Sequence, residues 1–284
     1  MIRTQKNGND TSISVIIPAY NAEKTIVASL DSVKNQTVIP NFYEVIVVDD
    51  GSTDKTLNLV NEYFYNNTEL HGAIISQKNA GVSAARNAGI YAAKGVWISL
   101  LDSDDVLHPR KNEIILDFIA ANMDAEFIGG NLTDAKTKIP FLGVLPDVKK
   151  IKPIELLIKW VPQTSTIMLK KSVFELVGGY DIEMKYAEDG DLYLKIAEKY
   201  NYYVLQKKLA SFGPENQKFM FGDSGLSGNL RGMFQGNMQI LRHALQRKTI
   251  HIGQYIIFVF WNAIKYMRRV IITKVRKNIL WKLL

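Results

Sequence analysis

The chain has 284 residues, of which 47% are hydrophobic and 22% charged, a composition that allows a full core and is typical of globular proteins. It has no cysteine, which excludes disulfides and thiolate metal sites. The net charge of +7 is unevenly placed, because residues 224–284 hold eleven Lys and Arg and no Asp or Glu, whereas the preceding residues hold 24 basic and 28 acidic ones. A mildly acidic body therefore precedes a basic tail, which indicates contact with a polyanionic surface, either a membrane or a nucleic acid.

Strands and helices are expected to alternate as far as residue 109, after a flexible, polar stretch at 1–12 without the apolar run of a signal peptide. Short apolar runs predict four strands, at 13–17, 45–48, 73–76 and 96–101. Pro18 is expected to end the first strand and Asn21 to cap the following helix; further helices are predicted near 57–64 and over 82–93. This order predicts an α/β fold, a mainly parallel sheet flanked by helices, whose ligands bind beyond the carboxyl ends of the strands.

The pattern is less regular after residue 109. The expected elements are a helix over 110–121, a strand at 127–130, short strands and loops to 152, a strand over 164–169, a helix over 188–200 and a loop over 211–228. The helix at 188 opens with acidic residues, which the helix dipole favours.

The C-terminal tail is helical in character from about residue 232. An apolar, aromatic run at 255–261 precedes basic residues that interleave with apolar ones between 265 and 277. The apolar run is too short to cross a membrane, but an aromatic, basic and amphipathic helix is typical of a segment that lies on an anionic membrane surface. The alternative is that its apolar stripe packs on the protein body or on a second subunit, as in a homo-oligomer.

Three carboxylates follow the fourth predicted strand, in Asp102-Ser103-Asp104-Asp105. They repel one another unless a cation lies among them, and the alternation of Asp102 and Asp104 suits a divalent metal. Mg²⁺ and Mn²⁺ prefer oxygen ligands and often complete their shell with substrate phosphates. The cluster by itself leaves two interpretations open, a metal site for a phosphorylated small molecule and a plain acidic loop.

Four motifs that occur in order favour the first interpretation. They lie at residues 15–21, 47–54, 79–87 and 101–105, and read VIIPAYN, VVDDGSTD, NAGVSAARN and LDSDD. Together they resemble the family 2 glycosyltransferases, which are inverting enzymes of GT-A fold that use nucleotide-sugar donors, here of the bacterial surface-polysaccharide type. The resemblance covers about 13–109 and resumes around 164–200.

The resemblance implies a donor pocket built from all four motifs. Tyr20 can stack on a uracil-type base, and Asp50 can accept a hydrogen bond from a base N–H. Glu23 either joins this pocket or is a solvated carboxylate in the first turn of a helix. Arg86 can meet the ribose, the phosphates or the acidic cluster, unless it is a surface arginine. The donor-binding residues that follow from the resemblance are Pro18, Ala19, Tyr20, Glu23, Asp50, Asn79, Arg86, Asp102, Ser103 and Lys218.

The resemblance also implies a metal ligand and a general base. Family usage assigns Asp102 to the ribose and Asp104 to Mg²⁺ or Mn²⁺, which neutralises charge on the departing diphosphate. Inversion further needs a base close to the acceptor hydroxyl. Asp189 matches the family's base, in a Glu-Asp pair at the start of a helix, and Glu188 is expected on the acceptor side.

Two departures from the family pattern put other contacts in doubt. Family members often carry an aromatic residue and an arginine in the helix after the base, where this chain has Leu-Tyr-Leu-Lys at 192–195, so its acceptor contacts do not follow from the resemblance. Residues 201–241 contain no His, which many members place near the metal or the diphosphate. Lys218 is expected to meet the diphosphate instead, and the nearby segment 222–227 is a candidate lid.

These inferences divide the chain into a flexible N-terminus (1–12), a nucleotide-sugar-binding half (13–109), an acceptor-binding half (110–222) and a loop with a basic helical tail (223–284). The expected function is metal-dependent transfer of a sugar from a UDP-linked donor to a lipid-linked glycan acceptor in cell-surface polysaccharide synthesis. The expected location is cytoplasmic and peripheral, on the inner face of the cell membrane.

Three other classes of protein fit the sequence less well. A nucleic-acid-binding protein would not need the apolar content of the tail, and the body is acidic. A dinucleotide-dependent oxidoreductase would carry G-x-G-x-x-G after the first strand, where this chain has Pro-Ala-Tyr-Asn. An inactive scaffold that binds partners through the basic tail would not need Asp102, Asp104 and Asp189 together.

Overall fold

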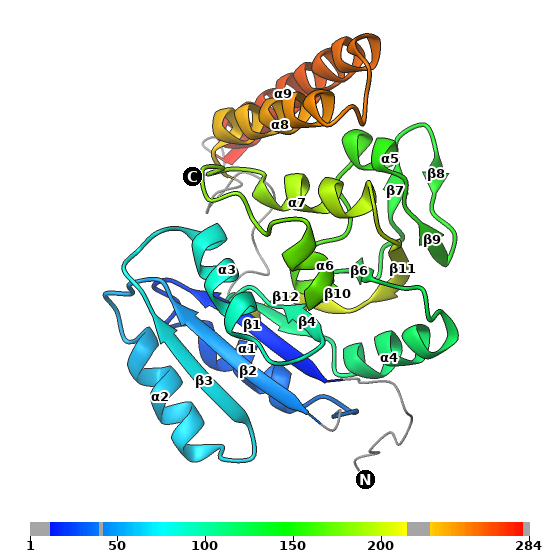
Figure 1. The fold of residues 1–284 in the computed structure, drawn as a ribbon. Coiled ribbons are helices and arrows are strands. Elements are labelled where there is room, and N and C mark those ends of the chain that lie inside the picture. The colour runs from blue at the N-terminus through cyan, green and yellow to red at the C-terminus, as the bar shows by residue number, and fades with distance from the viewer. Residues whose placement is uncertain (1–11, 40–41, 215–227, 281–284) are drawn as a thin grey trace.

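An eight-stranded sheet forms the centre of the molecule, with helices on both of its faces (Figure 1). The computed structural model describes residues 12–39, 42–214 and 228–280, with side chains as far as residue 275. The strand order is β3-β2-β1-β4-β10-β6-β11-β9. The expected flexible N-terminus lies outside the described residues, apart from Ser12.

The first half of the sheet contains the alternating elements that the sequence predicts. Its strands are β1 (Ile13–Ala19), β2 (Tyr43–Asp49), β3 (His71–Ser76) and β4 (Trp97–Leu100), and its helices are α1 (Ile26–Lys34), α2 (Thr56–Asn66) and α3 (Val82–Ala92). β1 lies between β2 and β4 and is parallel to both. The chain therefore changes its direction of travel across the sheet beside β1, which is where open parallel sheets bind ligands.

The inner strands β1, β2 and β4 are buried and largely apolar, whereas β3 at the edge of the sheet is mostly exposed. Val15 and Ile17 of β1 lie in a core shared with α1 and α2, whereas Ile16 packs on the opposite face with α3. Successive strand residues point to opposite faces, and each face here is covered by helices. The result is a rigid central layer that ends at the edge where the polar motifs begin.

The second half of the chain extends the same sheet. β10 (Met168–Lys170) is antiparallel to β4 and to β6 (Phe127–Asn131), and β11 (Tyr202–Lys208) and β9 (Val148–Lys150) complete the order. Two small ribbons pair β5 (Asp105–Leu107) with β12 (Ala210–Phe212), and β7 (Lys138–Ile139) with β8 (Gly143–Val144). The helices of this half are α4 (Lys111–Ala121), α5 (Pro153–Ile158), α6 (Lys171–Leu176) and α7 (Glu188–Ala197).

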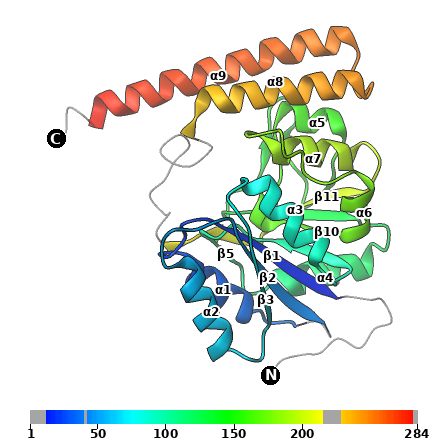
Figure 2. The same ribbon diagram turned by 60° about the vertical axis from the view of Figure 1, so that its left-hand side comes forward.

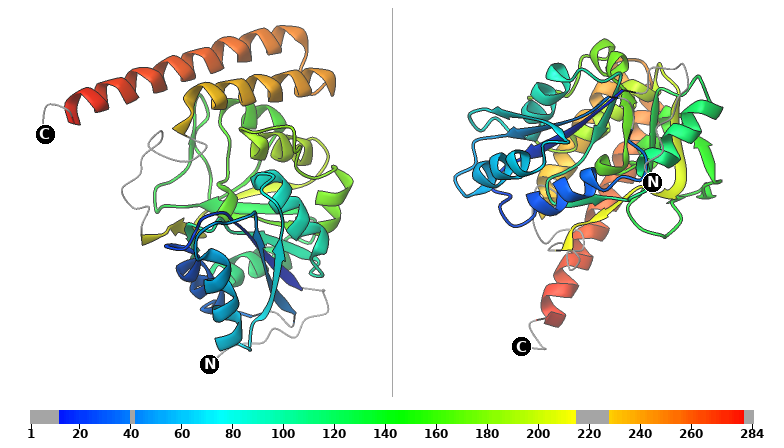
Figure 3. Two further views of the ribbon diagram at one scale, coloured as in Figure 1. Left: turned by 90° about the vertical axis from the view of Figure 1, so that its left-hand side faces the viewer. Right: turned by 90° about the horizontal axis from the view of Figure 1, so that it is seen from below.

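The C-terminal tail forms an antiparallel hairpin of two helices, α8 (Leu230–Gln246) and α9 (Ile252–Leu280), which lies over α5 and α7 (Figure 2). A separate apolar cluster joins it to the body through Leu194 of α7, Ile240 of α8 and Phe258 of α9. The last part of α9 runs past the start of α8 and projects beyond the body (Figure 3). None of the helices within the described ranges is long and apolar enough to cross a membrane.

Two expectations about the first strand and helix are wrong. Pro18 does not end β1, because β4 stops at Leu100, opposite Ile16, and the side on which proline lacks an N–H then has no neighbouring strand. Asn21 does not cap α1, which begins only at Ile26. The Asn21 side chain instead accepts a hydrogen bond from the backbone N–H of Thr53 in the next loop.

The expected strand over 164–169 is also partly wrong. Thr164–Thr166 forms a 3₁₀ helix, and the strand begins at Met168. The β-branched threonines favour a strand by propensity, but the Thr166 hydroxyl bonds locally instead, to the carbonyl of Gln163 at 2.6 Å. This turn lies directly beside the candidate site.

Candidate active site

The polar residues of the sequence motifs gather at one edge of the sheet. β1 ends at Ala19, β2 at Asp49 and β4 at Leu100, so Tyr20, Asp50 and Asp102 follow the ends of three adjacent parallel strands. Since these strands point the same way, their carboxyl ends bring the three side chains to the same region.

Asp50 is buried and holds the turn that contains Asn79. Its carboxylate accepts hydrogen bonds from the Gln77 side chain at 2.7 Å and from the backbone N–H groups of Ala80 and Gly81, both at 2.9 Å. Gly81 has a φ of +91°, which favours glycine, and it leads directly into α3. Three of about four carboxylate lone pairs are therefore used by the turn.

The other residues expected around the base occupy the end of β1. Tyr20 is 53% exposed, so its ring is available for stacking, while Pro18 and Ala19 are buried backbone neighbours. Glu23 precedes α1 rather than lying in its first turn, and its carboxylate accepts a hydrogen bond from the backbone N–H of Lys55, at the start of α2. Glu23 thus links the two loops that border the expected pocket.

Arg86 is the residue that joins the two halves of the site. It is 4% exposed on α3, and its guanidinium contacts carboxylates from separate parts of the chain. The distances are 2.7 Å to Asp102, 2.8 Å to Asp189 and 3.2 Å to Glu188. Of the three alternatives for Arg86, the acidic cluster is the one that this structure contains.

The cluster holds more acid than base. Three carboxylates face one guanidinium, and the ring of Tyr180 covers that guanidinium, with 5.3 Å between the Arg86 Cζ and the ring centroid. Burial, followed by the neighbouring Asp189, raises the pKa of Glu188 to about 7. Glu188 is therefore partly protonated near neutral pH, which reduces repulsion within the cluster.

The 3₁₀ helix supplies two site residues that the sequence analysis did not identify. The Thr164 hydroxyl donates to Asp189 at 2.8 Å and lies 3.0 Å from the hydroxyl of Tyr193. The Ser165 hydroxyl donates to Asp105 at 2.6 Å and accepts from the backbone N–H of Asp102 at 3.1 Å. The only sequence signal was the hydroxyl-rich stretch Thr164–Thr166, and the strand assignment concealed it.

The acidic cluster after β4 separates into a buried and an exposed carboxylate. Asp105 is buried, and desolvation, followed by the charge of Asp102, raises the pKa of Asp105 to about 7. Asp104 is exposed at the edge of the site, and the backbone carbonyl of Ser103 accepts from the hydroxyl of Ser29. Asp105 is thus buried beside the site, whereas Asp104 is exposed.

The donor set fits a divalent metal that is completed by a substrate. Within the described ranges, no group of three or more acidic or histidine side chains is placed to hold a metal alone. Mg²⁺ is commonly held by one or two carboxylates together with substrate phosphates. Asp104 and Asp102, two residues apart in the chain, are the residues that would hold such a Mg²⁺ or Mn²⁺.

Lys218 and the candidate lid at 222–227 lie outside the described residues. The sequence-predicted residues that the structure does bring together form two groups. Arg86, Asp102, Glu188 and Asp189 are directly connected, and Asp50 is connected to the Asn79–Gly81 turn.

Comparison with known proteins gives one family model, curated relatives and solved structures. Residues 14–139 match the model described as Glycosyl transferase family 2. The chain is 42% identical to a chondroitin synthase of Escherichia coli over 105 residues, which cover 37% of this chain and 15% of that protein. It is 28% identical to a chondroitin synthase of Pasteurella multocida over 246 residues, which cover 86% and 24%.

Two solved structures share the fold at 20% identity. S. aureus TarS 1–349 in complex with UDP-GlcNAc superposes with a TM-score of 0.65 and covers 87% of this chain and 70% of that chain. The mannosyltransferase PcManGT from Pyrobaculum calidifontis, in complex with GDP-Man and Mn²⁺, superposes with a TM-score of 0.64 and covers 82% and 64%.

Fold, motifs and family model agree on the class, and residues 14–139 form a domain that matches glycosyltransferase family 2. The expected GT-A fold with a C-terminal helical extension is confirmed. The chain spans less than a quarter of the length of the first three curated relatives it matches.

Lys111 supports the 3₁₀ helix from within the protein. It is fully buried as the first residue of α4, and its Nζ donates to the Ser99 hydroxyl at 2.9 Å and to the carbonyls of Ser165 and Ile167 at 3.0 and 3.2 Å. Burial lowers the pKa of Lys111 to about 7. A lysine at a helix start is normally solvated, so nothing in the sequence singled it out.

Replacing Lys111 with Met is expected to lower the free energy of unfolding by about 1–3 kcal/mol at pH 9, because two buried carbonyls lose their donor. The loss should grow with pH. Between pH 7 and 10 the unfolded chain holds a proton on Lys111 that the folded protein has released, so wild-type stability rises with pH relative to Lys111→Met, by up to about 1.4 kcal/mol per pH unit. Urea denaturation of both proteins at pH 7, 8 and 9 measures the difference. A difference that shrinks as the pH rises would contradict a buried lysine of low pKa.

Proposed function

We propose that the chain transfers a sugar, with inversion, from a UDP-linked donor to a glycan acceptor, with Asp189 as the general base. The observation that carries this proposal is the Arg86 guanidinium, which lies 2.7 Å from Asp102 and 2.8 Å from Asp189. Asp102 belongs to the donor motif, whereas Asp189 lies in the first turn of a helix in the other half of the chain. The expected donor edge and the expected base are thus held against one side chain, as a single displacement needs.

Several observations support a nucleotide-sugar donor. S. aureus TarS has been solved with UDP-GlcNAc and PcManGT with GDP-Man, both nucleotide sugars. In this chain the exposed ring of Tyr20 and the remaining lone pair of Asp50 can meet a base, and Asp102 can meet the ribose. Lys218, outside the described residues, is proposed to meet the diphosphate.

In the proposed reaction, Asp189 accepts the proton of the acceptor hydroxyl while that oxygen bonds to the anomeric carbon. The bond from the anomeric carbon to the diphosphate oxygen breaks, and the nucleoside diphosphate leaves. Thr164 and Arg86 each bind one oxygen of Asp189, which fixes the carboxylate and leaves further lone pairs for the proton. Glu188 is buried beside it and orders the acceptor side. Mg²⁺ or Mn²⁺ on Asp104 would neutralise charge on the diphosphate.

Asp189→Asn is expected to slow nucleotide release about 10²–10⁴-fold, because the amide cannot accept the proton. The affinity for UDP should stay within about twofold, since the base does not belong to the nucleotide-binding edge. The measurements are UDP release from the fastest member of a panel of UDP-sugars with Mn²⁺, and UDP binding by calorimetry. Glu183→Gln, an exposed carboxylate of the preceding loop, is the control and should release UDP at the wild-type rate. Near wild-type turnover by Asp189→Asn would remove Asp189 as the base.

Asp104→Asn is expected to weaken UDP binding in the presence of Mn²⁺ about tenfold or more, because the amide holds a divalent cation less well than a carboxylate. In EDTA the variant and the wild type should bind UDP equally. Calorimetric titration of UDP under both conditions measures this, with Glu62→Gln on the exposed side of α2 as the control. An equal loss of affinity in EDTA would assign Asp104 a role other than metal binding.

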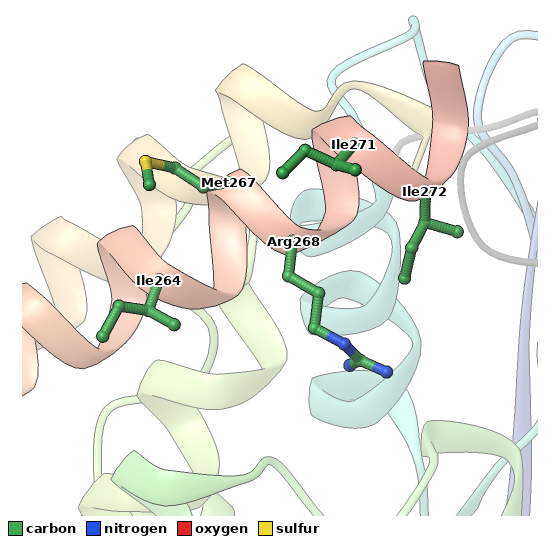
Figure 4. A pocket seen from close by; sticks show the side chains of 5 residues that line it. All are labelled: Ile264, Met267, Arg268, Ile271 and Ile272. Carbon is green, nitrogen blue, oxygen red and sulfur yellow. The ribbon is translucent and has the colours of Figure 1, made fainter. Parts of the chain in front are cut away.

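The outer face of α9 supports peripheral attachment to an anionic membrane. Six exposed apolar residues recur at helical spacing and form the apolar stripe of α9: Ile257, Phe260, Ile264, Met267, Ile271 and Val275. Figure 4 shows part of this face, where Ile264, Met267 and Ile271 lie beside Arg268 in a shallow hollow lined by α9 alone. Apolar residues flanked by cations, with no acid after Asp223, match the chemistry of a lipid surface with negative head groups.

This attachment gives the proposed acceptor its chemical class. An enzyme held on a membrane acts on acceptors that share that surface, so the acceptor is proposed to be a lipid-linked glycan of cell-surface polysaccharide synthesis. The proposed location is the cytoplasmic face of the cell membrane.

The double variant Ile264→Asn, Ile271→Asn is expected to reduce binding to phosphatidylglycerol-containing vesicles about tenfold or more, because each residue is about 60% exposed on α9 and would be buried in lipid. Vesicle sedimentation measures binding, and wild-type binding should fall in high salt or in pure phosphatidylcholine. Ile182→Asn, with 61% exposure on the body, is the control. Unchanged binding, or loss of a dimer in sedimentation velocity, would instead assign the stripe to contact between protein chains.

A further inference from the structure

We propose that α8 is a positioning element of the active site, which holds the backbone at Tyr186 and Ala187 and thereby places Asp189. This inference rests on the proposed role of Asp189 as the general base. Its basis is independent of the donor motifs, because it comes from how closely the C-terminal hairpin approaches the segment that enters α7.

Two glycines of α8 bring its backbone against Tyr186. A Cβ atom on Gly232 would lie 2.5 Å from atoms of the Tyr186 ring, and a Cβ on Gly236 would lie well inside the van der Waals contact distance from the Tyr186 carbonyl oxygen. Both glycines are buried and stand four residues apart, so they lie on one face of the helix. At these two positions α8 has no room for a side chain.

The contacted segment determines where the catalytic pair points. Ala187 has a φ of +60°, in the left-handed region that non-glycine residues seldom adopt, and it immediately precedes Glu188 at the start of α7. A conformation of this kind persists where the surrounding structure enforces it. α8 lies against this residue, since a Cβ on Gly236 would be 3.1 Å from the Ala187 Cβ.

Polar contacts fix the position of α8 relative to the segment at Tyr186 and Ala187. The Asn229 side chain accepts from the backbone N–H of Gly232 at 2.8 Å, which caps α8, and donates to the Tyr186 hydroxyl at 2.9 Å. About two turns further along, Asn237 accepts from the indole N–H of Trp160 at 2.8 Å. These bonds set the position of α8 along its axis, which decides whether its glycines face Tyr186.

A charged cluster holds the far end of α8 to α7. Asp191 is 1% exposed and lies 3.0 Å from the His243 ring, 3.3 Å from the Arg247 guanidinium and 2.9 Å from the Lys195 amine. Arg247 also pairs with Glu198 at 2.9 Å. α7 is therefore held by α8 at its beginning and along its length, and Asp189 stands between these attachments.

The expected result for Gly236→Ala is a kcat for nucleotide release at least about tenfold below wild type, because a misplaced base costs rate steeply. UDP affinity should stay within about twofold, since the nucleotide edge belongs to β1, β2 and β4. Gln235→Ala, at the neighbouring exposed position of α8, is the matched control and should match wild type. The donor is the same UDP-sugar with Mn²⁺, and circular dichroism verifies folding.

Combining Gly236→Ala with Asp189→Asn distinguishes a misplaced base from a general disturbance of the structure. If α8 acts through Asp189, Gly236→Ala should cost little further rate in the Asp189→Asn background. An equal loss in both backgrounds, or a parallel loss of UDP affinity, would overturn the inference. If Gly236→Ala does not fold, Tyr186→Phe removes only the bond to Asn229 and should lower kcat severalfold under the same double-mutant test.

Different results would contradict the proposed role of Asp189 and the proposed role of α8. A near wild-type rate for Asp189→Asn alone would overturn the assignment of the base. A large loss for Asp189→Asn together with unchanged rates for both Gly236→Ala and Tyr186→Phe would overturn only the role of α8.

Discussion

The arrangement of this site depends on one buried cation. Arg86 projects from α3 and binds carboxylates that follow β4 and begin α7, so a single guanidinium joins residues separated by about a hundred positions in the chain. Burying a charge is costly unless it is paired and hydrogen-bonded, and here each partner compensates the other. The planar fork of arginine suits this task because it presents several donors in fixed directions.

The balance of charge around Arg86 explains features that look unrelated. The excess negative charge is reduced by protonation of Glu188, since burial and the nearby Asp189 raise the pKa of Glu188 to about 7. The hydroxyls of Thr164 and Ser165 bind further carboxylate oxygens from the 3₁₀ helix, which Lys111 holds in place. The acidic cluster after β4 and the acidic start of α7 are therefore one electrostatic unit rather than two.

Much of this could be predicted from the sequence, and the reasons for the remainder are physical. Continuous apolar runs such as 13–17 identified strands buried on both faces, and the motif order identified the edge where they end. Pro18, Asn21 and the 164–166 turn were assigned wrongly because neighbouring segments decide their conformation: the early end of β4, the loop at Thr53 and the supporting Lys111.

The residues of the candidate site also fall into those that the sequence predicts and those that it does not. Arg86, Asp102, Glu188 and Asp189 stand in motifs and were recognised, but their mutual contacts depend on how two halves of the chain fold onto one sheet. Thr164, Ser165 and Lys111 act through tertiary contacts that no local pattern displays. The tail was recognised as helical and amphipathic, but its division into two helices that pack on the body, with the end of the longer one projecting, was not.

The unequal length of the hairpin helices has a geometric consequence. α9 has 29 residues and α8 has 17, so at 1.5 Å per residue α9 is about 18 Å longer, and this excess projects beyond the body (Figure 3). A helix lying flat on a bilayer, joined through a rigid hairpin to α7, would hold the site at a constant height above the lipid.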